Sequence, residues 1–378
     1  MIVEKRHWTA AGGWKVLRGA LAPEDAQLVL VFGARTLLAE DHMRHAIRAF
    51  YPKARIVGCS TSGEIVGAEV ADDSVVTLAM QFSRALVRVE HRALSNAEDS
   101  MSIGRQLAMA LAEPELAHVL VFSDGIHVNG TALVNGLRSG LPAEVMVTGG
   151  LAGDGSNFEQ TLILLDDECL DREVVAVGLY GESLKIGHGS LGGWDPFGPE
   201  RVITRSRGNI LYELDGAPAL ALYKSYLGLH ANELPNSGLL FPLSIRESES
   251  ARPLVRTILG IDEEAGSLTF AGDMPEGFRA QLMKANVDRL VDGAHGAALA
   301  AADESHSSPA LALLISCVGR KLVLKQRVEE ELEAVRDVLG DDVAMIGFYS
   351  YGEIAPASDS RCSELHNQTM TITTIDER

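Results

Sequence analysis

The sequence predicts an α/β protein of two related halves with mostly parallel sheets, whose β-α-β units close in glycine-rich turns and carry added antiparallel strands. Two observations lead to this prediction. Three stretches of the chain read as an apolar strand, a helix and a second apolar strand, and their closing turns are alike. Short continuous apolar runs around a helix are typical of parallel strands that are buried on both faces.

The three units have the same parts in the same order. Strand, helix and strand are expected at 27–33, 41–50 and 54–58; at 118–122, 131–139 and 144–150; and at 310–316, 326–339 and 343–347. Each parallel connection is expected to be a right-handed crossover.

The closing turns give the strongest internal match. Gly58–Ile65 and Gly347–Ile354 share the frame G-x-x-x-x-G-E-I, and Gly149–Gly155 takes the same place in the middle unit with different residues. A further apolar strand follows each turn, at 75–82, 160–165 and 367–375. The repeated frame in a repeated context indicates duplication.

The pattern changes between the second and third units. We expect a glycine-rich and proline-rich loop at 178–199, a hairpin at 201–216, helices at 217–227 and 276–302, and two strands around an acidic turn within 253–272. A boundary near residue 200 divides the chain into an amino-terminal α/β domain, 1–200, and a carboxyl-terminal domain, 201–378.

Composition narrows the function classes. The 378 residues include 33 Lys and Arg against 52 Asp and Glu, for a net charge of −19, which disfavours nucleic-acid and anionic-membrane binding. The longest apolar runs are about 5–8 residues, which are too short for a signal peptide or a membrane span. The four cysteines form no CxxC pair, so we expect a cytoplasmic protein.

The sequence contains no motif typical of an enzyme. GxSxG, HExxH, Walker A and EF-hand frames are all absent. His42 and His45 fit a solvated helix face, and Cys59 fits a small buried side chain. We therefore expect that the protein is not an enzyme. In the alternative that it is one, Cys59 or the pair Glu64 and Glu353 would be the catalytic residues.

The glycine-rich turns supply the candidate ligand-binding residues. Ligands bind at the carboxyl ends of strands in open parallel sheets, and turns without side chains let a ligand approach the backbone. The polar residues at these turns are Ser60, Thr61, Glu64, Asp154, Asn157, Tyr351 and Glu353. The alternative is structural: the glycines supply positive φ, and the hydroxyl groups cap the turns.

Several of these stretches together resemble the two-part FIST domain family, with its amino-terminal part near 27–220 and its carboxyl-terminal part near 221–360. The resemblance is carried, in order, by GCSTSGEI, GGLAGDG with NFEQTLIL, GHGSLGGWDPFGP leading into VITRSRGNILYELDGAPAL, GFYSYGEIAP and LHNQTMTITTI. It implies a sensory module that binds a small ligand. The sequence also resembles the haem-based nitric oxide sensors of this family. These proteins regulate a partner histidine kinase, with consequences for cyclic-di-GMP and biofilm.

The resemblance implies a non-covalent haem b, since CxxCH is absent. We expect His188 as the iron ligand, with Trp194 and Phe197 as walls of the ring slot; His127, His230 and His366 are the other candidates. In the alternative, a haem-free sensor binds a metabolite such as an amino acid, whose ammonium group contacts Glu64, Asp154 and Glu353. The oligomeric state stays open, with a homodimer among the options.

Overall fold

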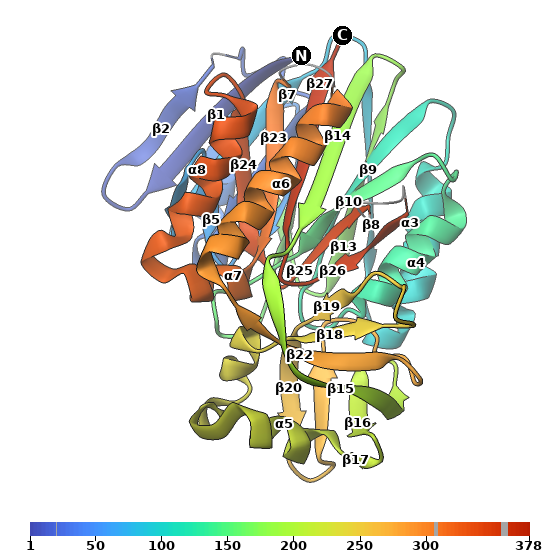
Figure 1. The fold of residues 1–378 in the computed structure, drawn as a ribbon. Helices are drawn as coiled ribbons and strands as arrows, with labels where there is room; N and C mark the ends of the chain where they lie inside the picture. The colour runs from blue at the N-terminus through green and yellow to red at the C-terminus, as the bar shows by residue number, and fades with distance from the viewer. Residues whose placement is uncertain (20, 306–308, 357–361) are drawn as a thin grey trace.

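The computed structural model describes residues 1–19, 21–305, 309–356 and 362–378 (Figure 1). Their strands form four sheets in a mixed α/β arrangement that is mostly antiparallel. The parallel ladders among the described strands are β3–β4, β9–β10 and β23–β24. The prediction of mostly parallel sheets is therefore wrong, because each β-α-β unit supplies a single parallel pair that antiparallel strands then flank.

The first three sheets are each built on one unit. In spatial order, the first sheet contains β12 (Glu168–Leu170), β11 (Ile163–Leu165), β4 (Arg55–Ser60), β3 (Leu28–Gly33), β7 (Ser74–Gln81), β1 (Ile2–Thr9) and β2 (Gly13–Arg18). The second contains β26 (Ser363–His366), β25 (Gly352–Pro356), β10 (Met146–Leu151), β9 (Leu116–Ser123), β13 (Glu173–Tyr180) and β8 (Leu86–Ala93). The third contains β14 (Leu184–Leu191), β27 (Met370–Glu377), β23 (Leu311–Cys317), β24 (Ala344–Ser350), β5 (Glu64–Val66) and β6 (Glu69–Ala71).

The units exchange their hairpins in a cycle. The hairpin β5–β6 of the first unit pairs with β24 in the third sheet, and β25–β26 of the third unit pairs with β10 in the second sheet. The hairpin β11–β12 of the second unit pairs with β4 in the first sheet. Strands from both sides of residue 200 thus share the second and third sheets.

One apolar core lies between the three sheets, and helices cover their outer faces. Phe32, Phe122 and Phe348, one from each unit, meet in that core with ring centroids 4.7–6.2 Å apart. The outer helices are α1 (Arg35–Ala39) and α2 (Asp41–Phe50) on the first sheet; η1 (Ala97–Asp99), α3 (Ser100–Leu111) and α4 (Gly130–Gly140) on the second; and α6 (Val287–Ser305), α7 (Val318–Leu324), η4 (Lys325–Arg327) and α8 (Val328–Leu339) on the third. Figure 1 shows α3 and α4 on one side of the molecule and α6 and α8 on another.

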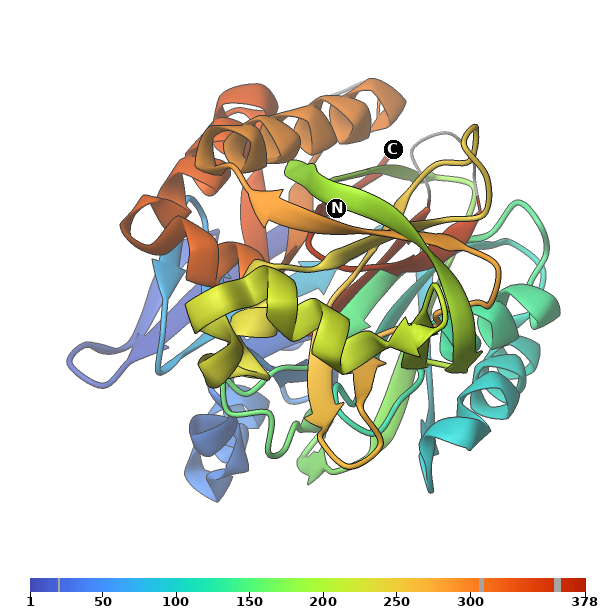
Figure 2. The same cartoon turned by 60° about the horizontal axis from the view of Figure 1, so that its bottom comes forward.

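The fourth sheet forms a separate layer with its own core. It contains β19 (Leu254–Arg256), β18 (Leu243–Arg246), β22 (Arg279–Ala285), β15 (Trp194–Arg207), β16 (Ile210–Leu214), β21 (Ser267–Phe270), β20 (Ile258–Asp262) and β17 (Ala217–Pro218), and it packs with α5 (Ala219–Leu227), η2 (Gly228–Glu233) and η3 (Asn236–Leu240). Figure 1 shows this layer below the other three sheets, at the end of the molecule far from both termini, and Figure 2 shows it from below, in front of them.

Most expectations for residues 178–302 are confirmed, and two are wrong. The hairpin at 201–216, the helix at 217–227 and the strands within 253–272 are present. The expected loop at 178–199 is largely strand, because its glycines allow close packing: a Cβ at Gly189 would lie 1.9 Å from the Ala297 carbonyl oxygen. The expected helix at 276–302 begins only at Val287, since 279–285 forms β22.

Among the described residues, no helix combines the length and the apolar character that a membrane span needs.

A glycine at the same place in each unit permits the two parallel strands to approach. A Cβ at Gly58, Gly149 or Gly347 would lie 1.7–1.8 Å from a carbonyl oxygen of the partner strand. These glycines are paired with Val31, Val121 and Leu314 in the three parallel ladders.

We expect Gly58→Ala and Gly347→Ala to lower the free energy of unfolding by about 3 kcal/mol each, because the backbone strands must separate to admit the methyl group. Urea denaturation measures the change. The control is Gly260→Ala in β20, where the nearest atom to the new Cβ is 3.9 Å away. Equal effects at Gly347 and Gly260 would contradict the argument.

Candidate functional site

The three glycine-rich turns meet at one place, where backbone hydrogen bonds join every pair of them. These bonds run from Gly153 N to Ser60 O (2.9 Å), from Ser62 N to Tyr349 O (2.8 Å) and from Tyr351 N to Leu151 O (3.2 Å). These bonds hold the three turns that carry the candidate ligand-binding residues against one another.

Glu64 and Glu353 occupy equivalent positions in two of the turns. Glu64 is fully buried; its Oε1 accepts from the Thr61 hydroxyl, and its Oε2 accepts from the Ser74 hydroxyl at 2.7 Å and the Ser74 N–H at 3.2 Å. Glu353 repeats this pattern. Its Oε1 accepts from Ser350 Oγ (2.7 Å), and its Oε2 accepts from Thr369 Oγ1 (2.9 Å) and Thr369 N (3.1 Å).

Burial dominates the protonation of both carboxyl groups. Removal from water raises the pKa of Glu64 to about 7 and that of Glu353 to about 7, although the hydroxyl and N–H donors oppose the shift. The common cause at equivalent positions indicates that the shifts come from the architecture of the repeated turn.

Asp154 and Tyr351 organise the middle turn. Asp154 Oδ1 accepts from the Phe158 N–H at 2.9 Å and from the Tyr351 hydroxyl, and its Oδ2 accepts from two further backbone N–H groups of the same loop. The Tyr351 ring stacks on Phe158 at 4.3 Å. Asn157 Nδ2 donates to the Asp154 carbonyl at 2.7 Å. Ser60 is likewise structural, since its hydroxyl accepts from the Leu162 N–H at 2.9 Å.

A small cavity opens beside these turns, and we call it the turn pocket. Its volume is about 150 Å³, and it is lined by Ala34, Arg35, Thr36, Thr61, Ser62, Gly63, Glu64, Asp72, Asp73, Asp154, Gly155 and Asn157. Of the seven predicted ligand-binding residues, Thr61, Glu64, Asp154 and Asn157 line it, whereas Ser60, Tyr351 and Glu353 do not.

The pocket contains groups of both charges. Arg35 is half-buried and donates to the Gln160 side-chain carbonyl at 3.3 Å, while Glu64, Asp72, Asp73 and Asp154 supply carboxyl groups. Sequence analysis missed Arg35, Asp72 and Asp73. Arg35 follows β3 directly, so the rule that ligands lie at strand ends could have identified it.

Lys321 of α7 closes one side of the first turn. Its Nζ donates to the Ser62 carbonyl at 2.9 Å, forms an ion pair with Asp72 and lies 5.7 Å from the Tyr349 ring centroid. Gly63 has φ +134°, and a Cβ there would lie 2.3 Å from Lys321 Nζ. The glycine therefore lets the lysine reach the backbone of the turn.

The residues expected to hold haem have separate structural partners. His188 is 7% exposed, and its Nδ1 forms an ion pair with Glu304 of α6 at 2.5 Å. Trp194 Nε1 donates to the Gln368 carbonyl at 3.0 Å, and Phe197 packs in the core of the fourth sheet. Because these side chains do not surround one cavity, they do not fit an iron ligand and ring slot for haem.

The other singled-out residues also have structural environments. His366 is buried, its Nε2 lies 3.1 Å from the Ala355 carbonyl, and burial lowers its pKa to about 3. His230 packs against Phe241, with ring centroids 5.4 Å apart. Cys59 is fully buried, and burial raises the pKa of its thiol well above the ordinary value, which suits a core residue and not a nucleophile.

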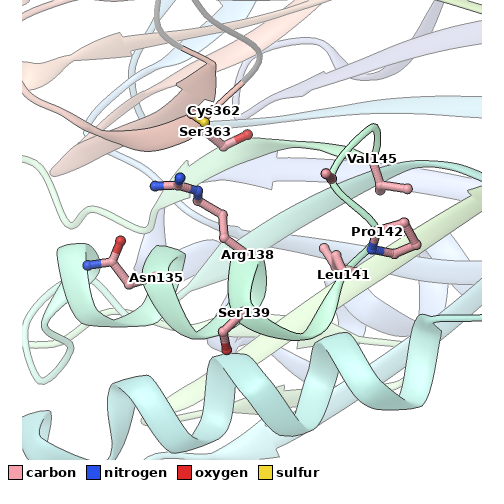
Figure 3. Close-up of a pocket in the computed structure, with 9 residues that line it drawn as sticks. Asn135, Arg138, Ser139, Leu141, Pro142, Val145, Cys362 and Ser363 are labelled. Carbon is pink, nitrogen blue, oxygen red and sulfur yellow. The ribbon is translucent and has the colours of Figure 1, made fainter.

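A larger cavity of about 390 Å³ lies elsewhere, between the carboxyl end of α4 and the start of β26. Figure 3 shows Arg138 extending from α4 toward Cys362 and Ser363, with Pro142 and Val145 in the segment after the helix. Its charged lining residue, Arg138, is exposed. This cavity is therefore larger than the turn pocket but lacks buried charged groups.

Residues 27–217 match the sequence family described as FIST N domain, and residues 219–356 match the family described as FIST C domain. An uncharacterised protein of Methanocaldococcus jannaschii is 23% identical over 363 residues, and the match spans 86% of this chain but only 65% of that protein. Cyanuric acid hydrolase from A. caulinodans aligns over 100% of this chain and 99% of its own, with 10% identity and a TM-score of 0.37, a likeness too weak to carry an argument.

The two buried carboxyl groups predict a pH dependence of stability. Between pH 4.5 and 7, folded Glu64 and Glu353 keep a proton that the unfolded chain releases, so their contribution to stability falls as pH rises through this window. Glu64→Gln and Glu353→Gln remove that loss. Each variant should therefore gain about 3 kcal/mol relative to the wild type from pH 4.5 to pH 8.

Urea denaturation at several pH values measures this gain. The control is Glu98→Gln, since the Glu98 side chain is 86% exposed, and its stability relative to the wild type should stay flat. A flat profile for Glu64→Gln and Glu353→Gln would show that burial does not raise these pKa values.

Proposed function

Because this chain belongs to the FIST family, through both its FIST N and FIST C domains, we propose that it is a sensory protein whose turn pocket binds a small zwitterion such as an amino acid. The observation that carries the proposal is that Arg35 and several carboxyl groups line one small cavity beside the turns where the three units meet.

The charges of the turn pocket suit a ligand that carries both signs. The Arg35 guanidinium offers a planar pair of donors to a carboxylate. Asp72 and Asp73 offer oxygen acceptors to an ammonium group. Glu64 contributes less, because both of its oxygens already accept hydrogen bonds from Thr61 and Ser74. Asp154 contributes less than the sequence suggested, because both of its oxygens already accept backbone N–H groups. Glu353 is outside the pocket and would make no contact.

The volume of the pocket favours a small ligand. At about 150 Å³, the pocket is smaller than the roughly 300–1,000 Å³ of typical sites for drug-sized ligands. An amino acid with a short side chain fits that space, whereas a macrocycle does not. The haem and nitric oxide alternative rests on the family resemblance alone and gains no support from the positions of His188, Trp194 and Phe197.

The position of the pocket supplies a route for signalling. Its lining residues come from the first unit and from the loop 154–157 of the second, so a ligand that contacts both would favour one arrangement of the two units. We include in the proposal that a separate protein reads this arrangement, with a histidine kinase as the candidate partner.

An enzyme that uses Glu64 as an acid or base is the second candidate, since a pKa of about 7 suits proton transfer near neutrality. The same pKa occurs at Glu353, which is not among the residues lining the pocket. Burial in a repeated turn explains both values, so we propose binding without catalysis.

A thermal-unfolding screen of the purified chain against single amino acids tests the proposal. A ligand at one hundred times its dissociation constant stabilises the folded state by about 2.7 kcal/mol, which raises the melting temperature by several degrees. Arg35→Gln and Asp73→Asn should abolish the shift. Glu353→Gln is the matched control: it removes a buried carboxyl of the same turn type outside the pocket and should keep the shift. Loss of the shift in Glu353→Gln alone would contradict the assignment.

A haemin titration tests the alternative. We expect no saturable Soret band in the wild type, because His188 is paired with Glu304. A saturable band that disappears in His188→Ala would instead establish the haem sensor.

A further inference from the structure

The second unit presents a cluster of metal-ligating side chains apart from the turn pocket. Asp124 directly follows β9, His127 lies three residues later, and Asp171 lies in the turn between β12 and β13. One ligand atom from each of the three residues lies within 4.8 Å of the other two. From this arrangement we propose that Asp124, His127 and Asp171 form a site for a divalent transition-metal ion.

Asp124 is held in place as a metal ligand must be. Its side chain is fully buried; Oδ1 accepts from the Ile126 and His127 N–H groups, and Oδ2 accepts from the Thr161 hydroxyl at 2.8 Å. Thr161 is itself oriented by the Gly125 N–H at 3.0 Å. Such outer contacts fix the direction in which a carboxylate presents its remaining lone pair.

The charges of the cluster call for a cation. A carboxylate oxygen of Asp124 and one of Asp171 lie within 4.8 Å of each other. Among the described residues, neither carboxyl group forms an ion pair with a lysine or arginine. The His127 side chain faces Asp124 with its Nδ1 3.4 Å from Oδ2, a long distance for a hydrogen bond. A metal ion would neutralise both carboxylates and accept the imidazole nitrogen in its neutral form.

The cluster is accessible from solvent. The His127 side chain is 31% exposed, and Asp171 is exposed in its turn. Asp124 forms the inner end of the site. The ion would therefore keep water on its outer face, since three protein ligands leave coordination positions open.

The ligand set favours particular metals. One imidazole nitrogen and two carboxylate oxygens suit Zn²⁺ and Mn²⁺, whereas Mg²⁺ and Ca²⁺ prefer oxygen ligands alone. The Irving–Williams order places Zn²⁺ above Mn²⁺ in affinity for such a set. The site should therefore be recognisable by its relative affinities for these metal ions.

Isothermal titration of the full chain with Zn²⁺, Mn²⁺ and Mg²⁺, with no other ligand present, tests the proposal. We expect one saturable site that binds Zn²⁺ more tightly than Mn²⁺ and Mn²⁺ more tightly than Mg²⁺. His127→Ala and Asp171→Asn should each weaken Zn²⁺ binding about tenfold or more. Circular dichroism checks that both variants are folded.

His91→Ala is the matched control. His91 lies on β8 of the same sheet and pairs with Glu173 at 2.8 Å, outside the cluster, so its loss should leave Zn²⁺ affinity unchanged. Cobalt(II) substitution adds a second readout, because a nitrogen-ligated ion gives a visible absorption that His127→Ala should alter. Absence of a saturable site, or wild-type affinity in both His127→Ala and Asp171→Asn, would overturn the proposal.

Discussion

The exchange of hairpins between neighbouring units is the constraint on which the rest of this structure depends. A single parallel pair leaves its edge strands with unpaired backbone groups, which must be covered. Here the hairpins β5–β6, β11–β12 and β25–β26 each cover an edge of a neighbouring unit. Because every hairpin leaves its own unit directly after the parallel pair, the three connecting turns must converge at one place. The turn pocket opens beside that convergence, between the first unit and the loop 154–157 of the second.

The turn that follows the hairpin of each unit has a different role in the three units. In the first unit, the turn between β6 and β7, at Asp72 and Asp73, lines the turn pocket. The corresponding turn of the second unit supplies Asp171 to the cluster with Asp124 and His127. In the third unit, Gln368 donates to the Leu239 carbonyl at 3.0 Å, so the layer of the fourth sheet occupies that position. Equivalent backbone thus carries a pocket, a cluster of potential metal ligands and a contact between layers.

The sequence predicts the local pattern well and the long-range pairing poorly. Apolar runs and the frame shared by Gly58–Ile65 and Gly347–Ile354 identify the units and place Glu64 and Glu353 in equivalent turns. Nothing local indicates that β5 pairs with β24, some 280 residues later, so parallel sheets were expected where antiparallel ones occur. Among site residues, Arg35 and Asp73 lie in short connections without a motif, so no sequence pattern identifies them. The contact between His188 and Glu304 joins residues far apart in the chain, and the sequence around His188 gives no sign of it.

The central claim is that a zwitterionic ligand lies between Arg35 and the carboxyl groups of the turn pocket. A crystal structure of the chain with its most stabilising amino acid tests this claim directly. We predict electron density in the pocket, with the ligand carboxylate on Arg35 and its ammonium group toward Asp72 and Asp73. Density only in the cavity beside Arg138, or an empty turn pocket in a crystal that holds the ligand elsewhere, would contradict the account.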